Sequence, residues 1–203
     1  LQLSQSIVES KDLNPKECGS WDSFFAQPEA GDPIESIRAR MTTFLRRAFR
    51  RPVEKETLDR FVAFAEKERQ GGASFTETMK TLVGATIASP DFLYLYNTED
   101  KDKESPGGSE RQKIDDFELA SRLSFFFWVS IPDDQLLDLA EAGKLSDPEV
   151  LGAQIDRMLD QAEAERKAGV AHMSHRGRAQ LIFNMVPKGK VFRELIALEE
   201  NAA

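Results

Sequence analysis

The chain has 203 residues, 40% of them hydrophobic, so it is long and apolar enough to bury a core. Its formal net charge is −8, with 27 Lys and Arg against 35 Asp and Glu, which argues against a general nucleic-acid or anionic-membrane binder. The single cysteine, Cys18, excludes an intramolecular disulfide, a CxxCH haem motif and a cysteine-based zinc site within these residues. The longest apolar run, residues 125–129, is far shorter than the roughly 20 residues that span a bilayer.

The first 32 residues are weakly periodic, and they are predicted to form an irregular lead-in with one short helix near residues 21–26. They lack the basic and apolar regions of a signal peptide, and they begin with Leu rather than Met. We therefore expect this chain to be a piece of something longer.

Residues 33–96 are predicted to form a three-helix unit. The first helix follows an N-cap at Asp32, and its apolar residues recur at helical spacing as far as residue 50. The second helix ends at the Gly-Gly pair after residue 70, and the third begins at Ser74 with a capping box. A helical turn or an extended segment then closes the unit.

Residues 97–113 are polar, charged and contain Gly-Gly, so they are predicted to be a linker between two units. The second unit, residues 114–203, begins with an aromatic-rich stretch at 117–134. Large apolar side chains lie on both sides of the helix predicted there, which indicates burial against two layers. Further helices are predicted over residues 134–142, 149–168, 179–186 and 192–200. The fold class is therefore all-α: two small, bundle-like helical subdomains joined by a polar linker.

The two histidines of the chain, His172 and His175, would share one face of a helix because they lie three residues apart. That spacing suits two ligands of a metal ion, but no third ligand is indicated, so the pair is a weak metal candidate. Ser174 lies next to His175. Adjacent side chains point in different directions, however, and a nucleophile activated by this histidine is not predicted.

The first predicted helix carries a cluster of arginines on the arc opposite its apolar residues. Guanidinium groups on one face suit bidentate contacts with phosphate, with sulfate or with a partner that bears carboxylates. The alternative is a solvated face that pairs with the acidic second helix. The arginines of this predicted face are Arg40, Arg46, Arg47, Arg50 and Arg51.

Two acidic positions resemble catalytic carboxylates but have simpler interpretations. Asp133 and Asp134 are adjacent, and after a Pro their expected role is to cap the following helix. Glu118 lies among aromatic residues, and Arg122 one turn later is its expected partner.

Three aromatic residues, Trp21, Tyr94 and Tyr96, are candidates for stacking on sugars. The alternative interpretation is that these side chains lie in the core or at its rim.

Two stretches together resemble a family of tandem helical domains. FLRRAFRRPV, a later Gly-Gly-x-Ser-Phe and SPDFLY resemble a short domain of unknown function numbered 1595. ELASRLSFFFWVSIPDDQLLDLAEAGKL resembles the start of the domain numbered 1592. The resemblance covers about residues 38–159, and we expect it to end there because the family's later aromatic segment has no counterpart in this chain.

Such tandem domains are typical of very large planctomycete proteins, which are often exported and often carry a c-type cytochrome module. The resemblance implies a periplasmic or otherwise exported location and a c-type haem elsewhere in the full-length protein, and it implies no catalytic residues. We therefore expect a non-catalytic structural or interaction module without a cofactor of its own. Its expected partners are other domains of the same protein, with polysaccharide as a further candidate.

Two alternatives stay open. The chain can be part of an oxidoreductase or carbohydrate-active enzyme whose active site lies partly outside it, or it can be a glycan-binding module. Neither a nucleic-acid partner nor a membrane span is expected.

Overall fold

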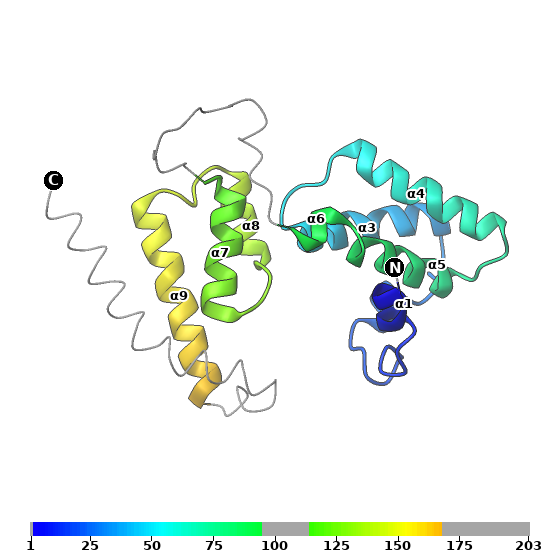
Figure 1. Cartoon of the computed structure of the whole chain (residues 1–203), viewed down its shortest axis with the longest axis horizontal. Coiled ribbons are helices and arrows are strands. Elements are labelled where there is room, and N and C mark those ends of the chain that lie inside the picture. Colours follow the sequence, from blue (N-terminus) through cyan, green and yellow to red (C-terminus); the bar gives the residue numbers. More distant parts are fainter. Residues whose placement is uncertain (1, 95–113, 168–203) are drawn as a thin grey trace, which may run out of the picture. The chain divides into compact units, whose positions relative to one another are not determined.

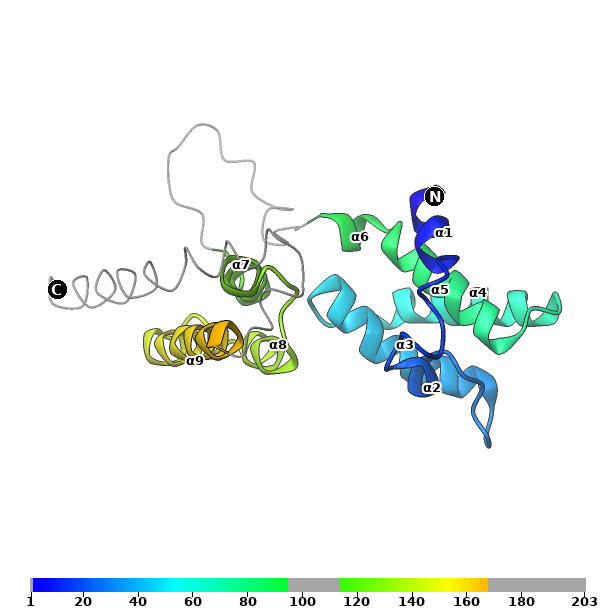
Figure 2. The ribbon, with the colours of Figure 1, turned by 90° about the horizontal axis from the view of Figure 1, so that it is seen from below.

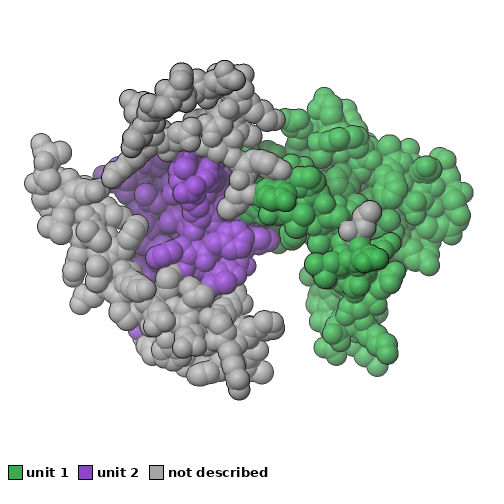
Figure 3. Space-filling view, viewed as in Figure 1, with its two compact units in different colours: residues 1–96 green, residues 97–203 purple. Residues whose placement is uncertain are grey.

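The structure is a computed structural model that describes residues 2–94 and 114–167, with side chains described as far as residue 164. Every regular element within these ranges is an α-helix, which confirms the all-α prediction. The chain divides into two compact units, unit 1 at residues 1–96 and unit 2 at residues 97–203 (Figure 3).

The helices of unit 1 are drawn in Figure 1 and, from a second direction, in Figure 2. They are α1 (Gln2–Val8), α2 (Trp21–Phe24), α3 (Pro33–Phe49), α4 (Lys55–Gln70), α5 (Phe75–Ile87) and α6 (Pro90–Leu93). The sequence predicts α3, α4 and α5 to within one or two residues, and its short helix in the lead-in is α2.

Local capping determines where the helices of unit 1 begin. Asp32 accepts a hydrogen bond from the N–H of Ile34 at 2.8 Å, just ahead of α3. Ser74 Oγ accepts from the N–H of Glu77 at 3.2 Å, and the Glu77 carboxylate accepts from the N–H of Ser74 at 2.7 Å, which confirms the predicted capping box. The hydroxyl and the backbone N–H of Ser74 also hold the pKa of Glu77 below its usual range.

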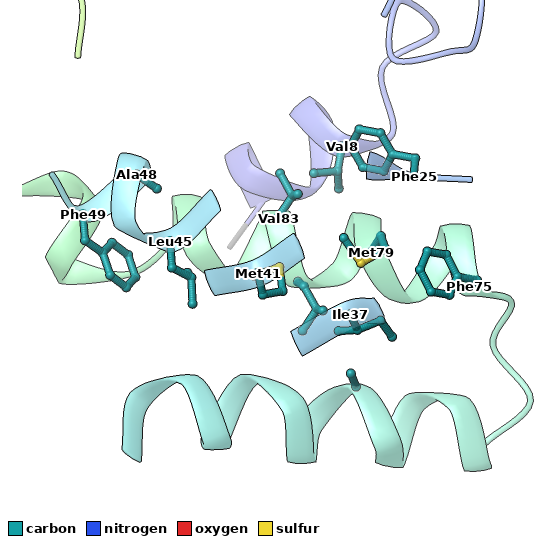
Figure 4. Close-up of a cluster of buried hydrophobic side chains, with 12 residues drawn as sticks. Val8, Phe25, Ile37, Met41, Leu45, Ala48, Phe49, Phe75, Met79 and Val83 are labelled. Carbon is teal, nitrogen blue, oxygen red and sulfur yellow. The ribbon is translucent and has the colours of Figure 1, made fainter. Parts of the chain in front are cut away.

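The core of unit 1 lies where α3, α4 and α5 pack together (Figure 4). Ile37, Met41 and Leu45 follow one another at a spacing of four on α3, and all three are fully buried. Met79 and Leu82 of α5 belong to the same cluster. Burying each of these side chains stabilises the fold by roughly 1.5–3 kcal/mol, so this cluster holds the three helices together.

Helix α1 corrects the prediction of an irregular lead-in. Its buried residues, Ser4 and Val8, are one turn apart, and the helix packs against α5. Gly84 of α5 faces this helix, and a Cβ placed there would lie 3.6 Å from the Val8 side chain, which is an ordinary van der Waals contact. A helix this short is not stable alone, so it depends on a contact with residues far along the chain. Local sequence patterns do not reveal such a contact.

The described part of unit 2 contains α7 (Asp116–Trp128), α8 (Asp134–Glu141) and α9 (Pro148–Lys167). Helix α7 packs against both α8 and α9, and Figure 2 shows the three helices nearly end-on. The core of this part of unit 2 is made of apolar residues from all three helices and from the loop before α9. These are Ala120, Leu123, Phe127, Leu136, Ala140, Leu145, Ile155, Met158 and Leu159.

An aspartate caps the start of each helix in the described part of unit 2. Asp115, Asp133 and Asp147 each accept a backbone N–H from two or three residues further on, at 2.6, 2.9 and 3.0 Å. The pattern at residues 146–149 resembles a capping box that starts at Ser146. In the structure Asp147 takes that role, because Pro148 occupies the first helical position.

The linker predicted over residues 97–113 and the helices predicted over 179–186 and 192–200 lie outside the described residues.

Candidate interaction surface on helix α7

Three consecutive phenylalanines near the end of α7 differ sharply in their exposure. Phe127 is 2% exposed and belongs to the core, whereas Phe125 and Phe126 are 43% and 46% exposed. The prediction that this helix is buried against two layers is therefore wrong for one side of it. The inward positions beside Phe127 are filled by the small residues Ser121 and Ser124, whose hydroxyls donate to backbone carbonyl groups of α7 itself. Small residues there let the neighbouring helices approach closely.

The exposed side of α7 continues into the turn that follows it. Val129 and Ile131 are 41% and 38% exposed. Together with Phe125 and Phe126 they form the α7 patch, the name used below for these four residues. Exposed apolar residues that occur singly are normal, but a contiguous group of large ones is typical of an interaction site.

The turn after α7 has an unusual backbone conformation. The N–H of Val129 donates to the carbonyl of Phe125 at 3.2 Å, and Val129 then adopts the left-handed region with a φ of 52°. This region is rare for a β-branched residue, whose side chain crowds the backbone there. Pro132 is buried and directly precedes Asp133, the cap of α8. The turn therefore lies between the end of α7 and the start of α8, and both of its ends are fixed.

Arg157 of α9 fastens this turn to the rest of unit 2. Its Nη1 lies 2.7 Å from Asp133 Oδ2, and its Nη2 donates to Asp133 Oδ1 at 3.3 Å. Its Nε donates to Gln154 Oε1 at 2.8 Å, and its guanidinium carbon lies 5.1 Å from the centre of the Trp128 ring. One side chain therefore connects α9 with the end of α7 and the start of α8. Asp133 caps α8, as predicted, and is also half of this ion pair.

A second contact closes the other end of the three-helix unit. The carboxylate of Asp116, in the first turn of α7, accepts the N–H groups of Leu145 and Ser146 at 2.8 and 3.4 Å. Glu118 and Arg122 form the predicted ion pair on α7, with the carboxylate buried and the guanidinium exposed. These polar side chains of α7 thus hold backbone groups or one another in place.

The predicted arginine face of α3 does not form one surface. Arg40 donates to the carbonyls of Phe24 and Ala26 at 2.8 and 2.7 Å, and it lies over the Phe75 ring at 4.9 Å. Arg50 adopts a φ of 60° just after α3 and is only 6% exposed. Burial lowers the pKa of Arg40, and burial together with the nearby charge of Arg51 lowers that of Arg50.

Arg50 is a structural clamp on α6. Its guanidinium donates to the carbonyls of Asp91, Phe92 and Tyr94 at 3.2, 3.1 and 2.9 Å, and to that of Ala48 at 3.3 Å. It therefore supplies partners for carbonyl groups that the short helix α6 leaves unsatisfied. The sequence did not reveal this role, because the left-handed conformation takes Arg50 out of the helical register of α3.

The other three arginines are less enclosed. Arg46 and Arg51 are half-buried and Arg47 is exposed, and their contact with an anion or an acidic partner stays a prediction. Arg38 forms an ion pair between α3 and α4, because its Nη1 lies 2.6 Å from Asp59 Oδ1. Lys55 and Arg38 hold the pKa of Asp59 below its usual range.

The candidate metal ligands His172 and His175 lie outside the described residues, and so does Tyr96. Within the described ranges, no three His, Cys, Asp or Glu side chains are grouped so that they could hold a metal ion. Trp21 packs against the core of unit 1 and its ring centre lies 5.1 Å from that of Phe25, whereas Tyr94 is 60% exposed. None of the helices in the described ranges is long and apolar enough to cross a membrane.

The fold and the surface define the chain as an all-α protein built from two helical units. Comparison with protein families gives these units an assignment: residues 36–97 match the model described as a protein of unknown function, DUF1595, and residues 114–198 match DUF1592. The two matches confirm the predicted tandem arrangement. The second match extends well past residue 159, so the expectation that the resemblance ends there is wrong. No curated protein and no solved structure matches the chain.

Proposed function

We propose that this chain is a non-catalytic interaction module of a larger exported, cytochrome-associated protein, and that the α7 patch binds another domain of that protein. The observation that carries the proposal is the contrast within the phenylalanine triplet. Phe127 is buried in unit 2, whereas Phe125 and Phe126 are not. Fully burying a Phe side chain is worth roughly 1.5–3 kcal/mol. Phe125 and Phe126 are 43% and 46% exposed, so unit 2 leaves nearly half of that free energy unused for each ring. A partner that covers the rings gains this free energy of burial.

The polar groups at the two ends of α7 support a binding role over a catalytic one. Asp116 and Asp133 accept backbone N–H groups, and Arg157 bridges Asp133 to Trp128. Each of these groups fixes the position of a helix end or of the turn after α7. Rigid support beneath an exposed apolar surface lowers the entropy lost on binding.

A binding experiment with separate parts of the natural polypeptide tests the proposal. The 203-residue chain and the segments that flank it in the natural protein are produced separately, and their association is measured by titration calorimetry. We expect Phe125→Ser to weaken the association by at least about tenfold, because a truncated anchor residue typically costs more than 1 kcal/mol. The matched control is Leu93→Ser, which removes an equally apolar, 60% exposed side chain from unit 1.

Circular dichroism shows whether the variants remain folded. Phe125→Ser should leave the thermal unfolding midpoint nearly unchanged, and Phe127→Ser should lower it strongly because that ring is in the core. If Phe125→Ser and Leu93→Ser weaken the association equally, or if neither does, the α7 patch is not the binding surface.

The exported, cytochrome-associated setting has its support in the family resemblance and needs its own test. We expect the full-length natural protein to fractionate with the periplasm and to stain for covalent haem after denaturing electrophoresis. A cytoplasmic protein without a haem stain would contradict this part of the proposal and leave the binding surface unaffected.

A further inference from the structure

The backbone conformation of Val129 indicates that the α7 patch contacts something outside unit 2. Among the described residues it is one of two non-glycine positions with a positive φ, and the other is Arg50. Residues kept in this conformation usually have a side chain with a role that outweighs the strain. Arg50 has such a role, since it is buried and donates to four carbonyl groups. The Val129 side chain is 41% exposed and is not part of the core cluster, so a comparable role for it lies at the surface of unit 2.

The charge around the patch limits what can bind there. Residues 114–164 contain twelve Asp and Glu but only three Lys and Arg. Two of these three cations, Arg122 and Arg157, form ion pairs with acidic residues of unit 2 itself. The described part of unit 2 is therefore strongly negative. A binding partner with the same sign of charge would be repelled, and a positive one would be attracted.

This charge argues against a second copy of the chain as the occupant. In a symmetric dimer the same patch of both copies meets at the two-fold axis. Two strongly acidic units would then face each other. An anionic membrane surface or an acidic polysaccharide is disfavoured for the same reason.

We infer that the α7 patch binds a basic, apolar segment, best represented by an amphipathic helix whose polar face carries Lys or Arg. The inference rests on the proposed function and adds the chemistry of the partner. Phe125 and Val129 are separated by one helical turn, as their backbone hydrogen bond shows. That spacing suits the apolar anchors of a helix laid against this face. The acidic surroundings select the sign of the charges around those anchors.

Two synthetic peptides test the inference with the full 203-residue chain. Both have leucines at helical spacing on one face, and the other face carries lysines in the first peptide and glutamates in the second. Binding is measured by fluorescence anisotropy at low and at high salt. We expect the lysine peptide to bind at least about tenfold more tightly than the glutamate peptide, and its affinity to fall as salt rises.

Variants then show whether binding occurs at the α7 patch. Phe125→Ser and Val129→Gly should each weaken the binding of the lysine peptide by at least about fivefold, because each removes an apolar contact. Leu93→Ser in unit 1 should not. If the glutamate peptide binds equally well and responds to the same variants, the inferred charge of the partner is wrong while the patch remains a binding surface.

Two further outcomes would contradict more than the inferred charge of the partner. If the lysine peptide binds but no variant in the patch affects it, the binding is a general property of an acidic protein, and both the inference and the proposed surface fail. Sedimentation velocity provides the other check. A dimer of the chain that Phe125→Ser dissociates would show that a second copy occupies the patch.

Discussion

The guanidinium of Arg157 spans both carboxylate oxygens of Asp133, with distances of 2.7 and 3.3 Å. Because Asp133 is also the N-cap of α8, this contact ties α9 to the first turn of α8 and to the turn that carries Val129 and Ile131. The Arg157–Asp133 contact therefore fixes the turn that carries part of the α7 patch.

Replacing Arg157 with Ala should lower the unfolding free energy of unit 2 by about 1–2 kcal/mol, from the loss of a partly exposed ion pair and of the contact with Trp128. Urea unfolding followed by tryptophan fluorescence measures this, in a Trp21→Phe background so that Trp128 of unit 2 is the only reporter. Lys144→Ala, which removes an exposed cation of unit 2, is the control and should cost less. Equal losses in the two variants would show that the Arg157 contacts have no special role.

Val129→Gly should raise the unfolding free energy of unit 2 by about 1 kcal/mol. Glycine adopts a positive φ without the steric cost of roughly 1–2 kcal/mol that other residues carry there, although it also makes the unfolded chain more flexible. Val129→Ala keeps a Cβ and should give no comparable gain. A loss of stability in the glycine variant would mean that the valine side chain contributes to folding, which would remove one argument for its role in binding.

Arg50→Ala should destabilise unit 1 by about 2–3 kcal/mol, because it leaves carbonyl groups of α6 and of the end of α3 without donors. Fluorescence of Trp21 in a Trp128→Phe background follows unit 1 alone. Arg60→Ala provides the comparison, since Arg60 is exposed and donates to the Thr57 hydroxyl at 3.0 Å. If both changes had the same small effect, Arg50 would not be a clamp.

Gly84 offers two substitutions with opposite expected effects. A Cβ at this position would meet Val8 at 3.6 and 3.8 Å, which is ordinary van der Waals contact. Gly84→Ala should therefore stabilise α5 by about 0.5–1 kcal/mol through helix propensity. Gly84→Leu should instead displace α1. Hydrogen exchange at residues 2–8 distinguishes the two, and protection of α1 that survives in the leucine variant would contradict this packing.

The helix starts could be predicted from the sequence because capping is local. Asp32, Ser74 and Asp133 each bond to an N–H only two or three residues away, so a short window of sequence contains all the information. Gly-Gly and Pro then mark where helices end. The starts of α3, α5, α7 and α8 were predicted from such caps. The segment at α6 was predicted as a helical turn or an extended stretch, and α1 was not predicted.

The candidate surface could not be predicted in the same way. Phe125 and Phe127 are chemically identical, and only the packing of α8 and α9 decides which of them is buried. The place of Arg50 on the predicted arginine face was wrong for a related reason. A helical wheel assumes that Arg50 continues the helix, but its left-handed backbone turns the side chain inward onto α6.

Photo-crosslinking tests the central claim most directly. Benzoylphenylalanine is placed at position 125 in the full-length natural protein, and at position 127 in a second sample, and the cross-linked peptides are identified by mass spectrometry. We expect position 125 to cross-link to a basic, apolar segment outside residues 97–203, and position 127 to cross-link within unit 2. Cross-links from position 125 confined to residues 97–203 would contradict this expectation, because the ring would then be covered by unit 2 itself.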